Sequence, residues 1–422
     1  MRYAENCVEL WERSAERRKE DAAGTVKLLE AAAAGAARGV PHQELVESLA
    51  VAGSYAEPTS DWASPDVQRG AEQWIAAIAA QLGVNGGCQP MLDAAMFRDL
   101  CAAHVRPYFA QQHQHQQFVL AGESGRPQPL VAQRWREYPQ SIAAFAWAFG
   151  RLADNEIKEA IPSILPVVLA LVDDYDSRAK LSGMRLARAL AARGDCEFLR
   201  KSGIAGVMDS SIGRCLAYRG DAEELAAPLL EAAFQAALAT GDVLYPSSAD
   251  PRYTEQWWRV VDRLITNDMY IAENVAAATV LGAQVAPLAD RLGVAIARYL
   301  RPLVGVVTRP LHSPAYLAAP VCQLHAVMVR QVVALADACP PRARAYVGDF
   351  VAALAASWNS TTSTQAEALC NEIGVLRALI TDAIRRLRAL DPDAVQSAVD
   401  QLSSARPGVF AGWSEPDGVD SH

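Results

Sequence analysis

Three aspartates interrupt an apolar run in the middle of the chain, and this interruption strongly limits the folds open to the sequence. They lie in residues 173–176, inside a stretch from 162 to 218 that has apolar helical patterns on both sides. Because aspartate caps helix starts, the pattern predicts a helix, a tight turn and a second helix. In this interpretation Pro162 and Pro166 open the first helix, since proline fits the first turn of a helix.

Neither predicted helix can hide its apolar face alone, so each must pack against the other and against neighbouring hairpins. A basic residue, Lys180, follows the turn, and the small residues Ser182 and Gly183 should let the two helices approach closely. This order is typical of a HEAT-type repeat. The chain is 51% hydrophobic but only 7% aromatic, and its many alanines favour helix. We therefore predict an all-α fold, a HEAT-like α-solenoid of stacked helical hairpins.

Charge and composition exclude several classes of partner. The formal net charge of -9 argues against nucleic acid, which needs a clustered basic surface. The longest uncharged apolar runs, at residues 161–172 and 275–289, are too short or too polar to cross a membrane. Eight cysteines are scattered without a Cys-x-x-Cys pair, and no signal peptide is apparent. We expect a soluble protein of a reducing compartment, in the cytoplasm and also the nucleus.

The chain divides into three predicted regions. Residues 1–129 form an N-terminal helical region that ends in a linker rich in glutamine, histidine and glycine. Residues 130–404 form the helical solenoid, with Gly241 among its joints and two almost continuous helices at 275–307 and 314–335. Residues 405–422 lack periodicity, which predicts a flexible tail.

The sequence lacks the common catalytic motifs. It has no phosphate-binding glycine loop and no Gly-x-Ser-x-Gly motif, and we predict neither a cofactor nor a metal site. His113 and His115 lie in a polar loop without the thiolates or carboxylates of a metal site. The sharpest enzymatic alternative is an all-helical, magnesium-dependent isoprenoid-type enzyme that uses Asp173, Asp174 and Asp176, since hard cations need clustered carboxylates. No convincing second motif accompanies them, so we predict a protein that is not an enzyme.

A longer run of residues resembles the Tel-two-interacting protein two family. The resemblance lies in a Leu-x-Asp-Asp turn, a basic-x-x-Gly step, an Arg-x-x-Gly step and a helix that ends in Cys-Leu-x-Tyr. These motifs are matched by Leu171 to Asp174, Lys180 to Gly183, Arg200 to Gly203 and Cys215 to Tyr218. A weaker likeness extends to the joint at Pro340-Pro341 and Trp358, so the resemblance covers residues 160–360. The segment after Tyr218 is shorter than the acidic loop usual in the family.

The resemblance implies a non-enzymatic scaffold, the smallest subunit of the Triple-T co-chaperone complex, which stabilises and matures phosphatidylinositol-3-kinase-related kinases. Its partners would be the two larger helical-repeat subunits, and indirectly the kinases and heat-shock chaperone machinery. A generic HEAT-repeat adaptor in another pathway, such as transport, stays open. Turn and joint residues are expected to line one edge of a solenoid. The predicted partner surface consists of Asp173, Asp174, Asp176, Arg178, Arg200 and Lys201.

Overall fold

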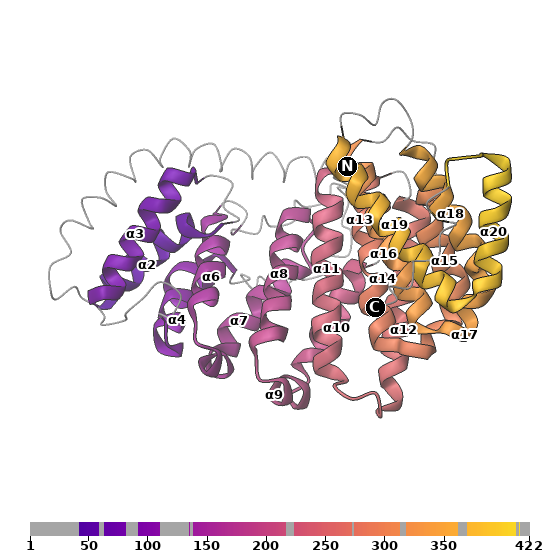
Figure 1. The fold of residues 1–422 in the computed structure, drawn as a ribbon. Helices are drawn as coiled ribbons and strands as arrows, with labels where there is room; N and C mark the ends of the chain where they lie inside the picture. Colours follow the sequence, from indigo (N-terminus) through magenta and orange to yellow (C-terminus); the bar gives the residue numbers. More distant parts are fainter. Residues whose placement is uncertain are drawn as a thin grey trace, which may run out of the picture. The chain divides into compact units, whose positions relative to one another are not determined.

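The computed structural model describes residues 42–58, 63–81, 92–109, 135, 138–216, 223–271, 274–312, 318–361, 369–410 and 413. These residues are almost entirely helical, as the sequence predicts (Figure 1). The one β contact among them is an isolated parallel bridge between Leu92 and Leu152. By its internal contacts the chain forms two compact units, residues 1–211 and 212–422. Each unit is described below by itself.

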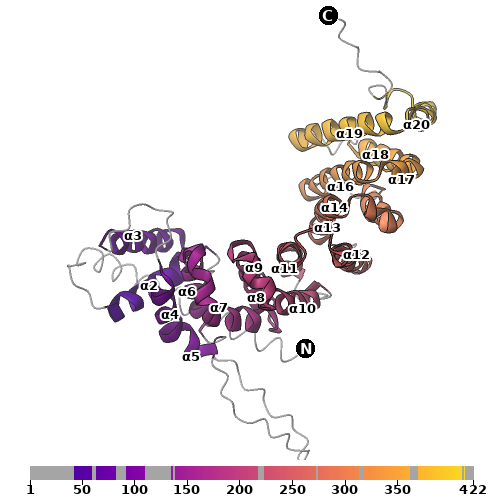
Figure 2. The same cartoon turned by 90° about the horizontal axis from the view of Figure 1, so that it is seen from below.

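The first unit contains the helices on both sides of the predicted linker. Within it α2 packs against α3 and α6, α4 packs against α7, and α7 packs against α8. In both views α2, α6 and α8 follow one another in one layer, and α4 and α7 lie in a second layer (Figures 1 and 2). The N-terminal helical region therefore packs on the helices that follow it. The elements are α2 (His42–Ala56), α3 (Pro65–Gln81), α4 (Ala94–Leu100), the π-helical turn η1 (Cys101–Val105), α5 (Arg106–Phe109), α6 (Gln140–Arg151), η3 (Asp154–Glu156), α7 (Ile157–Val172), α8 (Ser177–Arg193), α9 (Cys196–Lys201) and α10 (Ile204–Leu216).

Helix α7 begins earlier than its prolines suggest, so the prediction that Pro162 and Pro166 open it is wrong. The helix starts at Ile157, and both prolines lie in its interior. Each interior proline removes one intrahelical hydrogen bond. Ile157 and Ile161 are buried, and the apolar surface that they remove from water offsets this loss.

The second unit is built around α16. This helix packs against α13, α14 and α19, while α18 packs against α20. Asp391 caps the last helix by accepting the Ala394 N–H at 3.1 Å. The elements are α11 (Glu223–Leu244), α12 (Pro251–Ile271), α13 (Val275–Ala283), α14 (Val285–Leu292), η4 (Gly293–Tyr299), α15 (Leu300–Thr308), η5 (Pro310–His312), α16 (Ala319–Ala338), α17 (Pro340–Ala343), η6 (Arg344–Tyr346), α18 (Val347–Ser360), α19 (Cys370–Leu390) and α20 (Pro392–Ala405).

One local prediction in the second unit is wrong and another is confirmed. Gly241 is not a joint: it lies inside α11, where a Cβ would come within 2.5 Å of the buried Trp257 ring. The stretch at 275–307 is almost continuously helical, as predicted, and consists of α13, α14, η4 and α15, with a change of helix type at Gly293, whose φ is 50°. Positive φ suits glycine, which has no Cβ to clash.

Two segments of this unit, Val275–His312 and Ala319–Ala338, are long and apolar enough to cross a membrane by composition. This finding corrects the expectation that every apolar run is too short or too polar. In their most apolar windows 44% and 56% of the residues are buried inside the protein. Buried helices of a protein core have the same composition, so the length of these segments alone is weak evidence for a membrane span.

The predicted flexible tail does not hold for Phe410 and Trp413, whose side chains are buried. The ring centroids of Trp358 and Trp413 lie 5.5 Å apart in an edge-to-face arrangement. The Trp358 indole also donates to the Val409 carbonyl at 3.0 Å, and Arg388 donates to the Trp413 carbonyl. Trp413 thus packs against α18 and α19.

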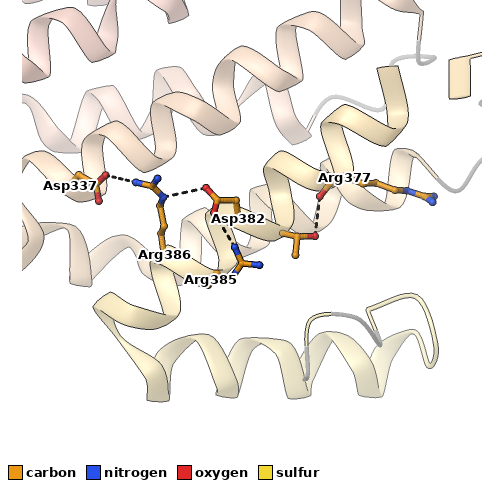
Figure 3. A network of polar contacts seen from close by, with 6 residues as sticks. Asp337, Arg377, Asp382, Arg385 and Arg386 are labelled. Carbon is orange, nitrogen blue, oxygen red and sulfur yellow. Dashed lines mark hydrogen bonds and ion pairs between the residues drawn. The ribbon is translucent and has the colours of Figure 1, made fainter. Parts of the chain in front are cut away.

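Arginines of α19 join this helix to its neighbours (Figure 3). Arg386 contacts Asp337 of α16 at 3.1 Å and Asp382 of its own helix at 3.2 Å. Arg377 donates to the Thr361 hydroxyl at 2.8 Å, just after α18. Since the Arg386 and Asp337 side chains are about half exposed, we assign this ion pair a small energy and a role in setting the helix register.

Candidate partner-binding site

The aspartate turn between α7 and α8 satisfies its own polar groups, as the sequence predicts. The Asp174 carboxylate accepts the Asp176 N–H at 2.8 Å and is buried. The Asp176 carboxylate accepts the N–H groups of Arg178 at 2.7 Å and Ala179 at 3.3 Å, which makes Asp176 the N-cap of α8. The Asp173 N–H donates to the Leu169 carbonyl at 3.0 Å and closes α7. These bonds fix the direction in which α8 leaves α7.

Gly183 lets α7 and α8 come close together, which confirms the role predicted for it. A Cβ at this position would lie 2.6 Å from the Val172 nitrogen and 2.8 Å from the Leu171 carbonyl carbon. Those atoms belong to the backbone and cannot move aside as a flexible side chain could. The hairpin therefore requires glycine at this contact.

The six residues of the predicted partner surface do not lie in one patch. The aspartates and Arg178 are at the start of α8, while Arg200 and Lys201 are on α9, after its end. A helix of 17 residues is about 25 Å long, so the two groups lie at opposite ends of the hairpin. Asp173, Arg200 and Lys201 are exposed, Asp176 and Arg178 are half-buried, and Asp174 is buried inside the turn. A single edge would need the joint before α8 and the joint after it to lie on the same side. Instead, successive joints alternate between the two ends of the helices.

The aspartate cluster shows no geometry that favours a metal ion. Asp174 and Asp176 point toward backbone N–H groups of the turn itself. Within the described ranges no group of three or more His, Cys, Asp or Glu side chains is placed to hold a metal. His113 and His115 lie outside the described residues. The isoprenoid-type enzyme hypothesis thus rests on sequence pattern alone.

Two arginine clamps, which sequence reasoning missed, hold successive helices together. Arg193 at the end of α8 donates to Asp154 at 2.8 Å, to the Phe149 carbonyl at 2.7 Å and to the Leu152 carbonyl. Its guanidinium also lies 5.1 Å from the centre of the Phe149 ring. These bonds satisfy the C-terminal end of α6, so Arg193 acts as a cap from a neighbouring helix. The only sequence signal was a basic residue in the last turn of α8.

The second clamp repeats this arrangement in the other unit. Arg291 of α14 donates to both carboxylate oxygens of Asp242, at 2.9 and 2.6 Å, and lies 5.1 Å from the Trp257 ring centre. The hydrogen bond to Asp242 raises the pKa of Arg291, while burial opposes the shift. A bidentate pair of this kind fixes the orientation of both partners. Side chains from α11, α12 and α14 therefore meet at one arginine.

A buried polar pair, His325 of α16 and Ser357 of α18, lies within the core of the second unit. The His325 Nδ1 is 3.0 Å from the Ser357 hydroxyl, and both residues are almost fully buried. Burial lowers the pKa of His325, and a weaker interaction with the Pro310 carbonyl opposes this shift. The pair is enclosed, which suits a structural role better than a reactive one.

The fold resembles that of solved karyopherin structures. Karyopherin Kap121p bound to the SUMO protease Ulp1p matches with a TM-score of 0.51 at 14% identity, covering 87% of this chain and 30% of that one. Kap121p bound to RanGTP matches with a TM-score of 0.56 at 13% identity, covering 96% and 36%. The chain spans about a third of the length of these proteins. At this identity the likeness shows the fold, a HEAT-like α-solenoid. No curated protein matches the sequence.

A family model identifies the chain more closely. The model of the Tti2 family matches residues 48–318, from α2 to the segment before α16. The match includes the aspartate turn, α8 and the motifs at Arg200 and Cys215. It starts earlier than the resemblance expected at residues 160–360, and the joint at Pro340 lies outside it. On this match over more than half of its length, the chain belongs to the Tti2 family.

Proposed function

We propose that the chain is a non-enzymatic scaffold subunit of the Triple-T co-chaperone complex, which stabilises and matures phosphatidylinositol-3-kinase-related kinases. The observation that carries the proposal is the family match over residues 48–318. A fold of stacked helices supports it, because each added hairpin contributes contact area for a large partner. The acidic chain, with its net charge of -9, suits protein partners rather than nucleic acid.

The proposed partners are the two larger helical-repeat subunits of that complex. Kinases and the heat-shock chaperone machinery would be reached through them. The proposed function needs no cofactor and no membrane, and it is carried out in the cytoplasm and also in the nucleus.

Affinity purification of the tagged full chain from its own cells, followed by mass spectrometry, tests the proposal. We expect two larger helical-repeat proteins and giant lipid-kinase-like kinases to be enriched over cells that express the tag alone. A folded chain that enriches neither group would refute the co-chaperone function.

The alternative is a HEAT-repeat adaptor in another pathway, and the likeness to karyopherins is the observation that favours it. That likeness is one of fold, because 13–14% identity is too low to carry over cargo or partners. The same purification separates the two functions. An adaptor for transport would enrich transport factors and cargo in place of the kinases.

The enzyme hypothesis is tested by the substitution Asp174→Ala. In a scaffold this change removes the acceptor for the Asp176 N–H and destabilises the turn by about 1–2 kcal/mol. In a magnesium-dependent enzyme, magnesium would also stabilise the unsubstituted chain, and Asp174→Ala would remove that added stabilisation. Thermal unfolding, with and without magnesium, distinguishes these outcomes.

A further inference from the structure

A small groove between α6 and α8 is a candidate binding surface within the first unit. Its volume is about 170 Å³. Residues 182, 185, 186, 189 and 193 of α8 line it, and their spacing of three and four places them on one helix face. Its apolar walls and its rim include Ile142, Ala146 and Phe149 of α6 and Arg185, Leu186 and Ala189 of α8. We call this feature the α6–α8 groove.

The size of the groove limits what it can hold. Pockets for drug-sized ligands measure roughly 300–1,000 Å³, well above this volume. The groove is large enough for one bulky apolar side chain. Anchor residues at protein interfaces fill apolar pockets of this kind. A peptide segment with one inserted side chain therefore fits better than a small molecule.

The charge around the groove indicates which charged group the ligand should carry beside its apolar side chain. Helix α8 contains five basic residues and no acidic residue, although the whole chain has a net charge of -9. Arg185 is exposed on the rim and forms no ion pair with any other described residue. Arg193 lines the groove while it is held by Asp154. Glu57 lines another part of the groove, so an incoming carboxylate is directed toward Arg185.

We propose that the α6–α8 groove binds an acidic peptide segment of a partner protein. One leucine-sized or phenylalanine-sized side chain enters the groove, and a neighbouring carboxylate pairs with Arg185. The apolar walls favour a peptide over nucleic acid, whose phosphates gain nothing from Ile142 or Leu186. The proposal rests on the proposed scaffold function, because it names one surface through which the scaffold would hold a partner.

The test uses the folded full chain and a phage-displayed library of random peptides. Enriched peptides are synthesised with a fluorophore, and their dissociation constants are measured by fluorescence polarisation. Ala146→Phe fills the groove and Arg185→Glu reverses its rim charge. Ala352→Phe, at an exposed alanine of α18, and Arg301→Glu, at an exposed arginine of α15, are the matched controls. Circular dichroism establishes that each variant is folded.

We expect the enriched peptides to combine aspartate or glutamate with one bulky apolar residue. Ala146→Phe and Arg185→Glu should each weaken binding by about tenfold or more, and both controls should stay within about twofold. Peptides without acidic residues, equal binding to all variants, or no enrichment would overturn the proposal. Tighter binding of a single-stranded oligonucleotide at the same Arg185 would also overturn it.

The proposed function can fail separately from the groove. If the chain still purifies with its two larger helical-repeat partners while no acidic peptide depends on Arg185, the scaffold function stands and the groove proposal fails. If acidic peptides bind in the groove but those partners are absent, the groove stands and the co-chaperone function fails.

Discussion

Asp176 controls the start of α8 through two backbone hydrogen bonds. Its carboxylate accepts the N–H groups of Arg178 and Ala179, which have no partner inside the helix. Asp176→Ala should destabilise this helix start by about 1 kcal/mol. Hydrogen–deuterium exchange in the first turn of α8 should then become about fivefold faster. Asp176→Asn keeps an acceptor oxygen and should exchange nearly as slowly as the natural chain. Equal exchange for Ala and Asn would show that the cap is unimportant.

His325 should make stability depend on pH. Its pKa in the folded protein is lowered by burial, while an unfolded histidine has a pKa near 6.5. As pH falls below about 6.5, the unfolded chain therefore binds a proton that the folded chain excludes, and stability decreases. The decrease ends below the lowered folded pKa. The pKa of His104 is also lowered by burial, so it contributes in the same direction.

The melting temperature measured from pH 8 to pH 5 tests this expectation. His325→Gln should reduce the fall in melting temperature across this range, because it removes a group whose pKa is lowered in the folded protein. His325→Gln also loses stability at pH 8 because the packing around the side chain changes. The test therefore compares only the slope of the melting temperature against pH. An unchanged slope would contradict the buried neutral state of His325.

At the scale of helices, Gly183 fixes the distance between α7 and α8. Gly183→Ala would place a methyl group within 3.0 Å of the α7 backbone, and overpacking of this kind costs about 1–3 kcal/mol. Gly213 of α10 is the matched control, since a Cβ there meets nothing within 4 Å. Gly213→Ala should stabilise by up to about 1 kcal/mol because alanine favours helix. Thermal unfolding that shows no difference between the two variants would disprove the close contact.

Arg193 connects α8 to the end of α6. Arg193→Ala would remove the donor to the Leu152 carbonyl and one of the two donors to the Phe149 carbonyl, with an expected cost of about 1–2 kcal/mol in unfolding free energy. Arg193→Lys should recover only a small part, because an ammonium group cannot reproduce the guanidinium fork. Arg185→Ala, at an exposed position on the same helix, gives the background effect. Full stability in Arg193→Lys would show that charge alone is sufficient.

Helix order could be predicted from the sequence wherever caps and apolar spacing agree, as at the aspartate turn. The start of α7 could not, because the burial of Ile157 outweighs the local cost of Pro162. Arg193 was missed for a related reason. Its acceptors lie 39 to 44 residues earlier in the chain, and two of them are backbone carbonyls, which have no sequence signature. The partner surface stays a prediction, and its residues occupy the joints before and after α8, which lie at opposite ends of that helix.

At the scale of the whole molecule, composition and helical periodicity were sufficient for the fold class. The division into two units was not predictable, because it falls inside α10, a continuous helix with the buried residues Ser211 and Ile212 at the boundary. The family match from residue 48 was also missed. Helices α2 and α4 pack on α6 and α7, and their sequence carries no compact motif.

The most direct test of the proposed scaffold function is the mass of the assembled complex. The chain is co-expressed with the two larger helical-repeat subunits of the Triple-T complex, and light scattering after size-exclusion chromatography gives the mass of each species. We expect one species that contains one copy of each of the three proteins. A folded chain that elutes alone, beside a complex of the other two, would contradict the account.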